Sequence, residues 1–152
     1  AIPRNSAWHR LHENAWGEDS AEQFGEMLAH DNPDPFDVIC IHPYPRATST
    51  YAGGTTNYHA VIALSQHYAQ RAGKPLFVEE FGVSEDQLPV GQHRAMFAEM
   101  LEAIEREHVP LSAFWVYDFA YQTKCNITFG NDRAWMLDSV MQANKRLQGD
   151  KP

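Results

Sequence analysis

Cysteine and positive charge are both scarce in this sequence, and each shortage narrows the functions open to it. Its 152 residues include two cysteines, and 12 lysines and arginines stand against 20 aspartates and glutamates, for a formal net charge of −8. This acidic balance argues against nucleic acid and against an anionic membrane surface as partners, because both repel negative charge. It suits a neutral substrate. The pairing of two cysteines cannot be deduced from their positions, so the redox compartment stays open.

Patterns typical of several other functions are also missing. No apolar run approaches the roughly 20 residues that span a bilayer, and no phosphate-binding glycine loop, nucleophile elbow or Cys-x-x-Cys pair occurs. His9 and His12 lie three residues apart, but no third ligand has a recognisable spacing, which argues against a zinc site. The first residues show neither an initiator methionine nor a signal-peptide pattern. This favours either a removed leader or a piece of a longer chain.

Three short apolar runs stand out, at residues 37–44, 75–81 and 111–117. Each has the length of a strand, is rich in β-branched or aromatic residues and is almost continuously apolar. Such runs are typical of parallel strands covered on both faces. With 43% hydrophobic residues, the chain also has enough apolar side chains for the core of one ordinary domain.

Helical patterns flank and separate these runs, over residues 20–30, 56–73, 93–108 and 134–148. Ser20 and Gln23 have the spacing of a capping box, and Gly73 is a typical helix stop. Alternating helices and strands predict parallel strands joined by right-handed crossovers. The starts of the three runs are 38 and 36 residues apart. Eight such units would take roughly 300 residues, the size of a β/α barrel.

Three parallel strands leave two open edges and cannot close into a barrel by themselves. The sequence therefore predicts an α/β fold in which residues 1–152 form the C-terminal portion of a (β/α)8 TIM barrel. That portion would hold three parallel strands and their flanking helices. A small stand-alone α/β sandwich is the alternative.

Polar and aromatic side chains gather where each predicted strand ends, which is where β/α barrels place their chemistry. They are His42 and Tyr44, then Glu79 and Glu80, then Trp115, Tyr117 and Asp118. Side chains alternate along a strand. We therefore expect His42, Tyr44, Glu80 and Trp115 to face one shared hollow.

The same alternation predicts a different place for Glu79. It would point to the other face of the sheet, near the surrounding helices. A charge there needs a partner, and Arg94 or His93 is the expected one.

The residues around the expected hollow suit chemistry on a sugar. A carboxylate such as Glu80 can attack an anomeric carbon while hydrogen bonds from a phenol and an imidazole keep it ionised and aimed. The flat indole of Trp115 suits stacking against the apolar face of a sugar ring. Each residue also has an ordinary alternative: Glu80 as a surface carboxylate, and His42 and Trp115 as parts of the core.

Three of these segments resemble the last strands of one enzyme family. IHPYP (41–45), with its His-x-Tyr motif, is similar to the sixth barrel strand of family 5 glycoside hydrolases and their clan A relatives. EEFG (79–82), preceded by Lys-Pro, is similar to the seventh strand, and AFWVYDF (113–119) to the eighth. They occur in the family's order and spacing. The resemblance implies strands six to eight of a glycosidase barrel.

The resemblance also implies a role for each residue. Glu80 would be the nucleophile of a retaining β-glycosidase, with His42 and Tyr44 as its supports. Trp115 would be the platform under the reacting sugar. This mechanism needs a second carboxyl group roughly 5–5.5 Å from the first, and the sequence has no match to the family's Asn-Glu acid/base of strand four. No cofactor is implied. Glu79 favours the β-mannanase branch, so the expected substrate is a β-linked polysaccharide of mannan type.

Two further residues are candidates for contact with substrate. Tyr51 lies in a loop rich in proline and glycine after the first run, where it either lines a sugar cleft or packs the loop. Asp118 follows the third run and either hydrogen-bonds to substrate or caps the local structure.

Two hypotheses of other classes stay open. One is a non-catalytic module that binds glycans, or that associates through its open strand edges with another copy or with the missing N-terminal part of the barrel. The other is a different barrel enzyme that uses Glu80 as a base.

Overall fold

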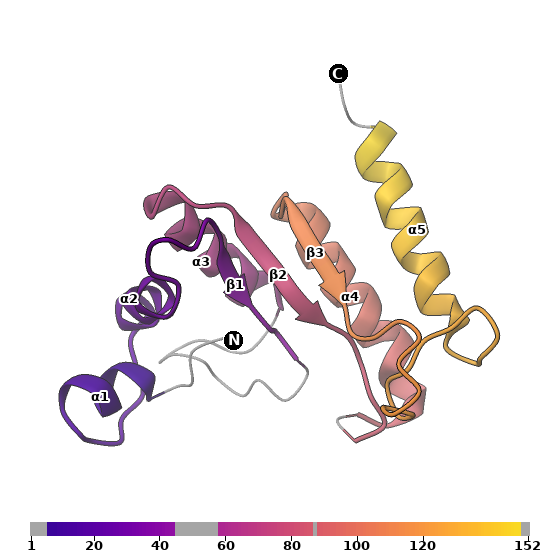
Figure 1. The fold of residues 1–152 in the computed structure, drawn as a ribbon, viewed down its shortest axis with the longest axis horizontal. Coiled ribbons are helices and arrows are strands. Elements are labelled where there is room, and N and C mark those ends of the chain that lie inside the picture. Colours follow the sequence, from indigo (N-terminus) through magenta and orange to yellow (C-terminus); the bar gives the residue numbers. More distant parts are fainter. Residues whose placement is uncertain (1–5, 45–57, 87, 150–152) are drawn as a thin grey trace.

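A sheet of three parallel strands, in the order β1-β2-β3, forms the centre of the structure (Figure 1). The computed structural model describes residues 6–44, 58–86 and 88–149. The strands are β1 (Ile39–Ile41), β2 (Leu76–Phe81) and β3 (Leu111–Phe114). All three predicted runs are therefore strands, and both pairings are parallel as expected. The first strand is shorter than its run, and Pro43, which has no N–H for the ladder, lies just beyond it.

Helices precede and follow each strand. They are α1 (Ala7–His12), α2 (Ala21–Asp31), α3 (Tyr58–Arg71), the 3₁₀ helix η1 (Val90–Gln92), α4 (His93–Arg106) and α5 (Ala134–Gly149). The four predicted helices are confirmed, while α1 and η1 are additional. The capping box forms: Gln23 N donates to Ser20 Oγ at 3.2 Å, and Ser20 N donates to Gln23 Oε1 at 2.7 Å. After α3, Gly73 adopts a φ of 69°, which glycine tolerates without strain.

The core lies between one face of the sheet and the two helices α3 and α4, which Figure 1 shows behind the strands. Its fully buried members include Ile39, Ile41, Leu76, Val78, Ile62, Phe97 and Met100. α2 packs against α3, and α5 packs against α4. This is the helix-covered outer face that a β/α barrel presents. No helix among the described residues is long and apolar enough to cross a membrane.

The second face of the sheet departs from the expectation that both faces are covered. Cys40, Phe77 and Leu111 stand in register across the three strands on this face. Cys40 and Phe77 are half-buried, and Leu111 is 48% exposed. In a closed barrel such side chains meet those of the strands opposite. The described part of this chain has no strands opposite, so the face stays open.

The packing of α2 on α3 depends on the small size of Gly25. A Cβ atom added to Gly25 would overlap the ring of Tyr68, which comes from α3. The aromatic ring therefore occupies the space that any larger residue at position 25 would need.

We expect Gly25→Ala to destabilise the protein, although alanine is the better helix former by about 1 kcal/mol. The added methyl group must displace the Tyr68 ring, at a cost of about 1–3 kcal/mol typical of overpacking. Denaturant unfolding measures the change. In a Tyr68→Ala background the same substitution should be neutral or stabilising, and an equal loss in both backgrounds would show that this contact is not the cause.

Candidate active site

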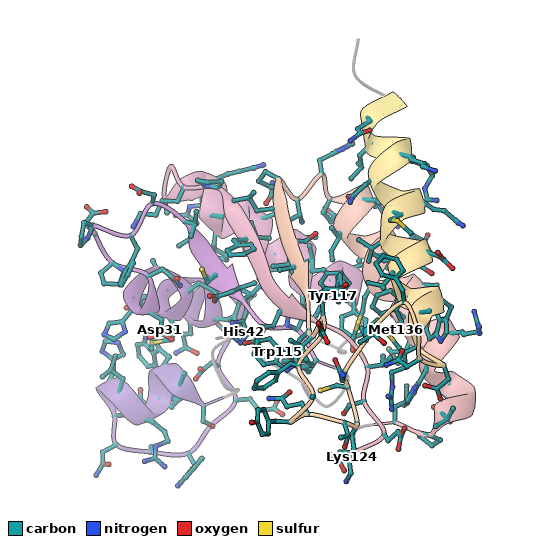
Figure 2. All side chains as sticks on the ribbon, turned by 45° about the vertical axis from the view of Figure 1, so that its right-hand side comes forward. Asp31, His42, Trp115, Tyr117, Lys124 and Met136 are labelled. Carbon is teal, nitrogen blue, oxygen red and sulfur yellow. The ribbon has the colours of Figure 1, made fainter. Side chains whose placement is uncertain are left out.

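The candidate site lies at the carboxyl ends of the three strands. His42 and Tyr44 follow β1, Glu79 and Glu80 lie in the last half of β2, and Trp115 follows β3 directly. Figure 2 shows His42 and Trp115 together at this end of the sheet. Parallel strands bring these segments to one edge although more than 70 residues separate the first from the last.

An irregularity in β2 sets the direction of its two carboxylates. Val78 pairs with Ser112 and Phe81 pairs with Phe114. Between these two pairs β2 therefore has two residues and β3 has one. One extra residue of this kind is a β-bulge. Val78 and Phe81 are both buried on the helix side. The two glutamates between them therefore turn to the open side of the sheet.

The expectation that Glu79 points toward the helices is wrong, because Val78 faces the helices and alternation therefore turns Glu79 to the open side. Regular alternation would then send Glu80 toward the helices, and the bulge turns it to the open side as well. The Glu79 carboxylate instead lies 2.9 Å from Nε2 of His42. Neither expected partner contacts it: His93 Nε2 lies 2.8 Å from the Leu88 carbonyl, and the Arg94 guanidinium lies 4.5 Å from the centre of the Trp135 ring.

Glu80 is the more enclosed of the two carboxylates, with 24% of its side chain exposed against 45% for Glu79. The Tyr44 hydroxyl donates to Glu80 Oε2 at 2.6 Å, and His42 Nδ1 lies 3.5 Å from the same oxygen. Burial, and then the hydrogen bond to Glu80, raises the pKa of Tyr44 well above its ordinary value. The phenol therefore keeps the proton that it donates.

His42 lies between the two acids and links them. Its hydrogen bond to Glu79 is the main reason why the pKa of that carboxyl is lowered, although burial opposes the shift. Nearby, burial and then the charge of Glu79 raise the pKa of the Cys40 thiol. A neutral imidazole has one N–H and can donate to only one of the two carboxylates, whereas its protonated form can donate to both.

Trp115 is held against the end of β2 by its backbone and by its ring. Its N–H donates to the Phe81 carbonyl at 2.8 Å. A Cβ at Gly82 would lie 2.7 Å from the Trp115 carbonyl oxygen, so this close approach requires the glycine that follows Phe81. The indole Nε1 donates to Gln122 Oε1 at 2.6 Å. Sequence reasoning missed Gln122, since no periodic pattern marks a polar residue within a loop.

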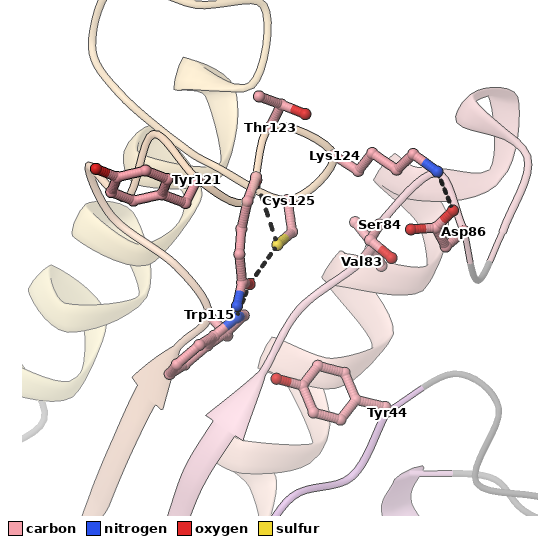
Figure 3. A pocket seen from close by; sticks show the side chains of 10 residues that line it. Tyr44, Val83, Ser84, Asp86, Trp115, Tyr121, Thr123, Lys124 and Cys125 are labelled. Carbon is pink, nitrogen blue, oxygen red and sulfur yellow. Dashed lines mark hydrogen bonds and ion pairs between the residues drawn. The ribbon is translucent and has the colours of Figure 1, made fainter.

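A cavity of about 500 Å³ opens beside these residues, between the segment after β2 and the loop after β3 (Figure 3). Tyr44 and Trp115 line it. Its other lining residues are Val83, Ser84, Asp86, Tyr121, Gln122, Thr123, Lys124 and Cys125. Because Tyr44 also binds Glu80, the cavity adjoins the more enclosed carboxylate.

The other predicted substrate-binding residues take different places. Asp118 is exposed, has a φ of 48° and donates its backbone N–H to the Ile127 carbonyl at 3.0 Å; it does not line the cavity. Tyr117 packs edge-on against Phe129, with ring centres 6.2 Å apart. Tyr51 lies outside the described residues. Contacts of Asp118 and Tyr51 with substrate stay predictions.

The two histidines near the start serve local contacts. His9 Nδ1 lies 2.7 Å from Glu13, and the His12 ring stacks on Trp8 with centres 4.6 Å apart. Over residues 6–44, 58–86 and 88–149, no three side chains of the metal-binding types gather closely enough to hold an ion.

Comparison with known proteins supports the fold. No protein-family model matches the sequence, and no curated protein matches it either. Among solved structures, the endo-1,4-β-mannanase from Rhizomucor miehei is similar, with a TM-score of 0.51 and 22% sequence identity. The match covers 81% of this chain but 35% of the mannanase chain, so this sequence spans about a third of its length. At this identity the likeness shows the fold alone. The predicted class, an α/β arrangement matching part of a (β/α)8 barrel, is confirmed.

Proposed function

We propose that this chain is part of a retaining β-glycosidase barrel that acts on a neutral β-linked polysaccharide of mannan type, with Glu80 as the nucleophile. The observation that carries the proposal is the short hydrogen bond from Tyr44 to Glu80 at the end of a barrel-type strand. It places an aimed, partly enclosed carboxylate beside a cavity that contains the indole of Trp115. The mannanase named above supports the choice of substrate class.

Glu80 suits the nucleophile's role better than Glu79 for two reasons. A nucleophile must be held in one position, and Glu80 accepts from a phenol that stays protonated. It is also less exposed than Glu79, so less water competes for its oxygens. Glu79 is tied to His42 and is proposed to hold that imidazole in place as a positioning residue.

The retaining mechanism needs a second carboxyl group on the other side of the scissile bond, roughly 5–5.5 Å from the first. Glu79 does not suit this role, because it neighbours Glu80 on one strand and is bound by the same imidazole. Our proposal assigns the acid/base to a segment of the complete barrel beyond this sequence. His42 and Tyr44 then support Glu80 as the nucleophile, and Trp115 carries the reacting sugar.

A fluorosugar inactivator should label Glu80. We suggest a 2-deoxy-2-fluoro-β-mannoside with a dinitrophenolate leaving group, because this group departs without protonation and the acid/base is then not required. The fluorine slows hydrolysis of the glycosyl-enzyme, so peptide mass spectrometry should find the sugar on residue 80. Glu80→Gln should abolish labelling and lower kcat/KM on the order of 10³-fold or more.

Glu79→Gln is the matched control for this experiment, since it removes the neighbouring charge from the same strand. It should still be labelled at residue 80. A sugar attached to Glu79 in the unaltered protein would overturn the assignment. Binding of mannan oligomers without any labelling would instead favour the glycan-binding module.

Alkaline titration tests the burial and hydrogen bonding of the Tyr44 phenol. The folded protein holds the pKa of the Tyr44 phenol above its ordinary value of 10.0. The protonated phenol therefore contributes its full share to the stability of the folded state below about pH 10, and this share is lost as the pH rises through the pKa of the folded state. The free energy of unfolding should therefore fall above about pH 10 more steeply in the unaltered protein than in Tyr44→Phe. Tyrosinate absorbance should show one late-ionising phenol fewer in the variant. Superimposable plots of unfolding free energy against pH for the two proteins would contradict the raised pKa of Tyr44.

A further inference from the structure

Side-chain interactions join the two walls of the cavity beside Trp115. Arg133, at the start of α5, is 9% exposed and donates both to Glu85 and, at 3.1 Å, to the Thr123 carbonyl. It thus ties the segment after β2 to the loop after β3. Lys124 Nζ and Asp86 Oδ1, 2.5 Å apart, add a second link at the rim, visible in Figure 3. A preformed cavity loses little conformational entropy when a ligand binds.

Tyr121 gives this cavity a second aromatic surface. Its side chain is 92% exposed, so it has no part in the core. Phe119 meets its ring edge-on, with centres 5.8 Å apart, and so supports it from the side. Tyr121 and Trp115 line the same space of about 500 Å³, within the range of roughly 300–1,000 Å³ of small-molecule sites. Two aromatic surfaces in one cavity suit two successive sugar rings.

The charges of the lining exclude an ionic ligand. Among the described residues that line it, Asp86 and Lys124 are the only carboxylate and ammonium groups, and they neutralise each other. The remaining polar side chains include the hydroxyls of Ser84 and Thr123. A phosphate or a uronate would need an unpaired cation, whereas sugar hydroxyls exchange hydrogen bonds with hydroxyl, amide and paired ionic groups alike.

We propose that this cavity is a subsite for an uncharged sugar unit next to the one over Trp115, with Tyr121 as its stacking surface and the Asp86–Lys124 pair as its hydrogen-bonding rim. The inference rests on the proposed function and deepens it. It assigns the recognition of chain length and of neutral substituents to the loop after β3, apart from the carboxylates that carry the chemistry.

Calorimetric titration of the protein that carries this chain, with Glu80→Gln to prevent turnover, tests the subsite. The ligands are β-1,4-linked mannose and glucose oligomers from the disaccharide to the hexasaccharide. Adding Tyr121→Ala should weaken binding of the longer oligomers about tenfold, the effect expected for the loss of one aromatic stacking surface. The shortest oligomer that binds should be unaffected. Phe129 is an exposed residue of the same loop that does not line the cavity. Phe129→Ala should change neither the affinity for the shortest oligomer nor that for the longer ones.

A second variant tests the charge argument. Asp86→Asn removes the carboxylate that pairs with Lys124. It should raise the affinity for an oligomer that ends in a uronic acid and change the affinity for neutral oligomers by no more than a few-fold. Tighter binding of the uronic acid oligomer by the protein with Asp86 intact would overturn the proposal. Melting temperatures of the variants exclude a general loss of folding.

The outcomes separate this proposal from the proposed function. If Tyr121→Ala changes no affinity while Trp115→Ala abolishes binding, the subsite is refuted and the glycosidase assignment stands. If no oligomer binds and no fluorosugar labels Glu80, both are refuted. Equal losses from Tyr121→Ala and Phe129→Ala would show a general effect of the loop and would also refute the subsite.

Discussion

Between Val78 and Phe81, β2 contains one residue more than the stretch of β3 beside it, and the arrangement of the site depends on that residue. Both flanking side chains are buried on the helix side, so the two carboxylates between them emerge on the open side. A regular strand would have sent Glu80 toward the apolar layer of α3 and α4, where an unpaired charge is costly. The bulge avoids that cost and brings two acids to one imidazole.

Two neighbouring carboxylates disfavour each other's ionisation unless donors compensate. Here the donors come from the chain just after β1: His42 contacts both acids, and the Tyr44 hydroxyl binds Glu80. The acids come from β2. The site therefore exists only while β1 and β2 stay paired in the register that matches Ile41 with Val78. Burial of those two side chains in the core fixes this register, since a slip of one residue would expose both.

The sequence predicts the elements well because their periodicities report which side chains meet the core, and this is a local property. It also places His42, Tyr44 and Glu80 together, since parallel strands end at one edge. It fails for Glu79, because alternation does not show which face of a strand meets the helices, and in β2 that face holds Val78. It also misses the bulge that turns Glu80 to the open side, since a bulge belongs to a pair of strands and neither strand's own sequence reveals it. It also misses Gln122, since contacts made within a loop follow no period that could mark them.

The two ion pairs that join the loops differ in strength, and this difference bears on how the cavity works. Lys124 and Asp86 have 59% and 62% of their side chains exposed, so water screens their attraction and their pairing contributes little to stability. Arg133 is buried and also binds a backbone carbonyl, so its removal would leave polar groups unpaired in the protein. Arg133 therefore holds the loop in place, while in the proposed subsite the weaker pair at the rim would exchange hydrogen bonds with a sugar at little cost. Because Glu80 is supported by Tyr44 and His42 and not by this loop, substitutions at the rim would alter the proposed sugar recognition without moving the carboxylate.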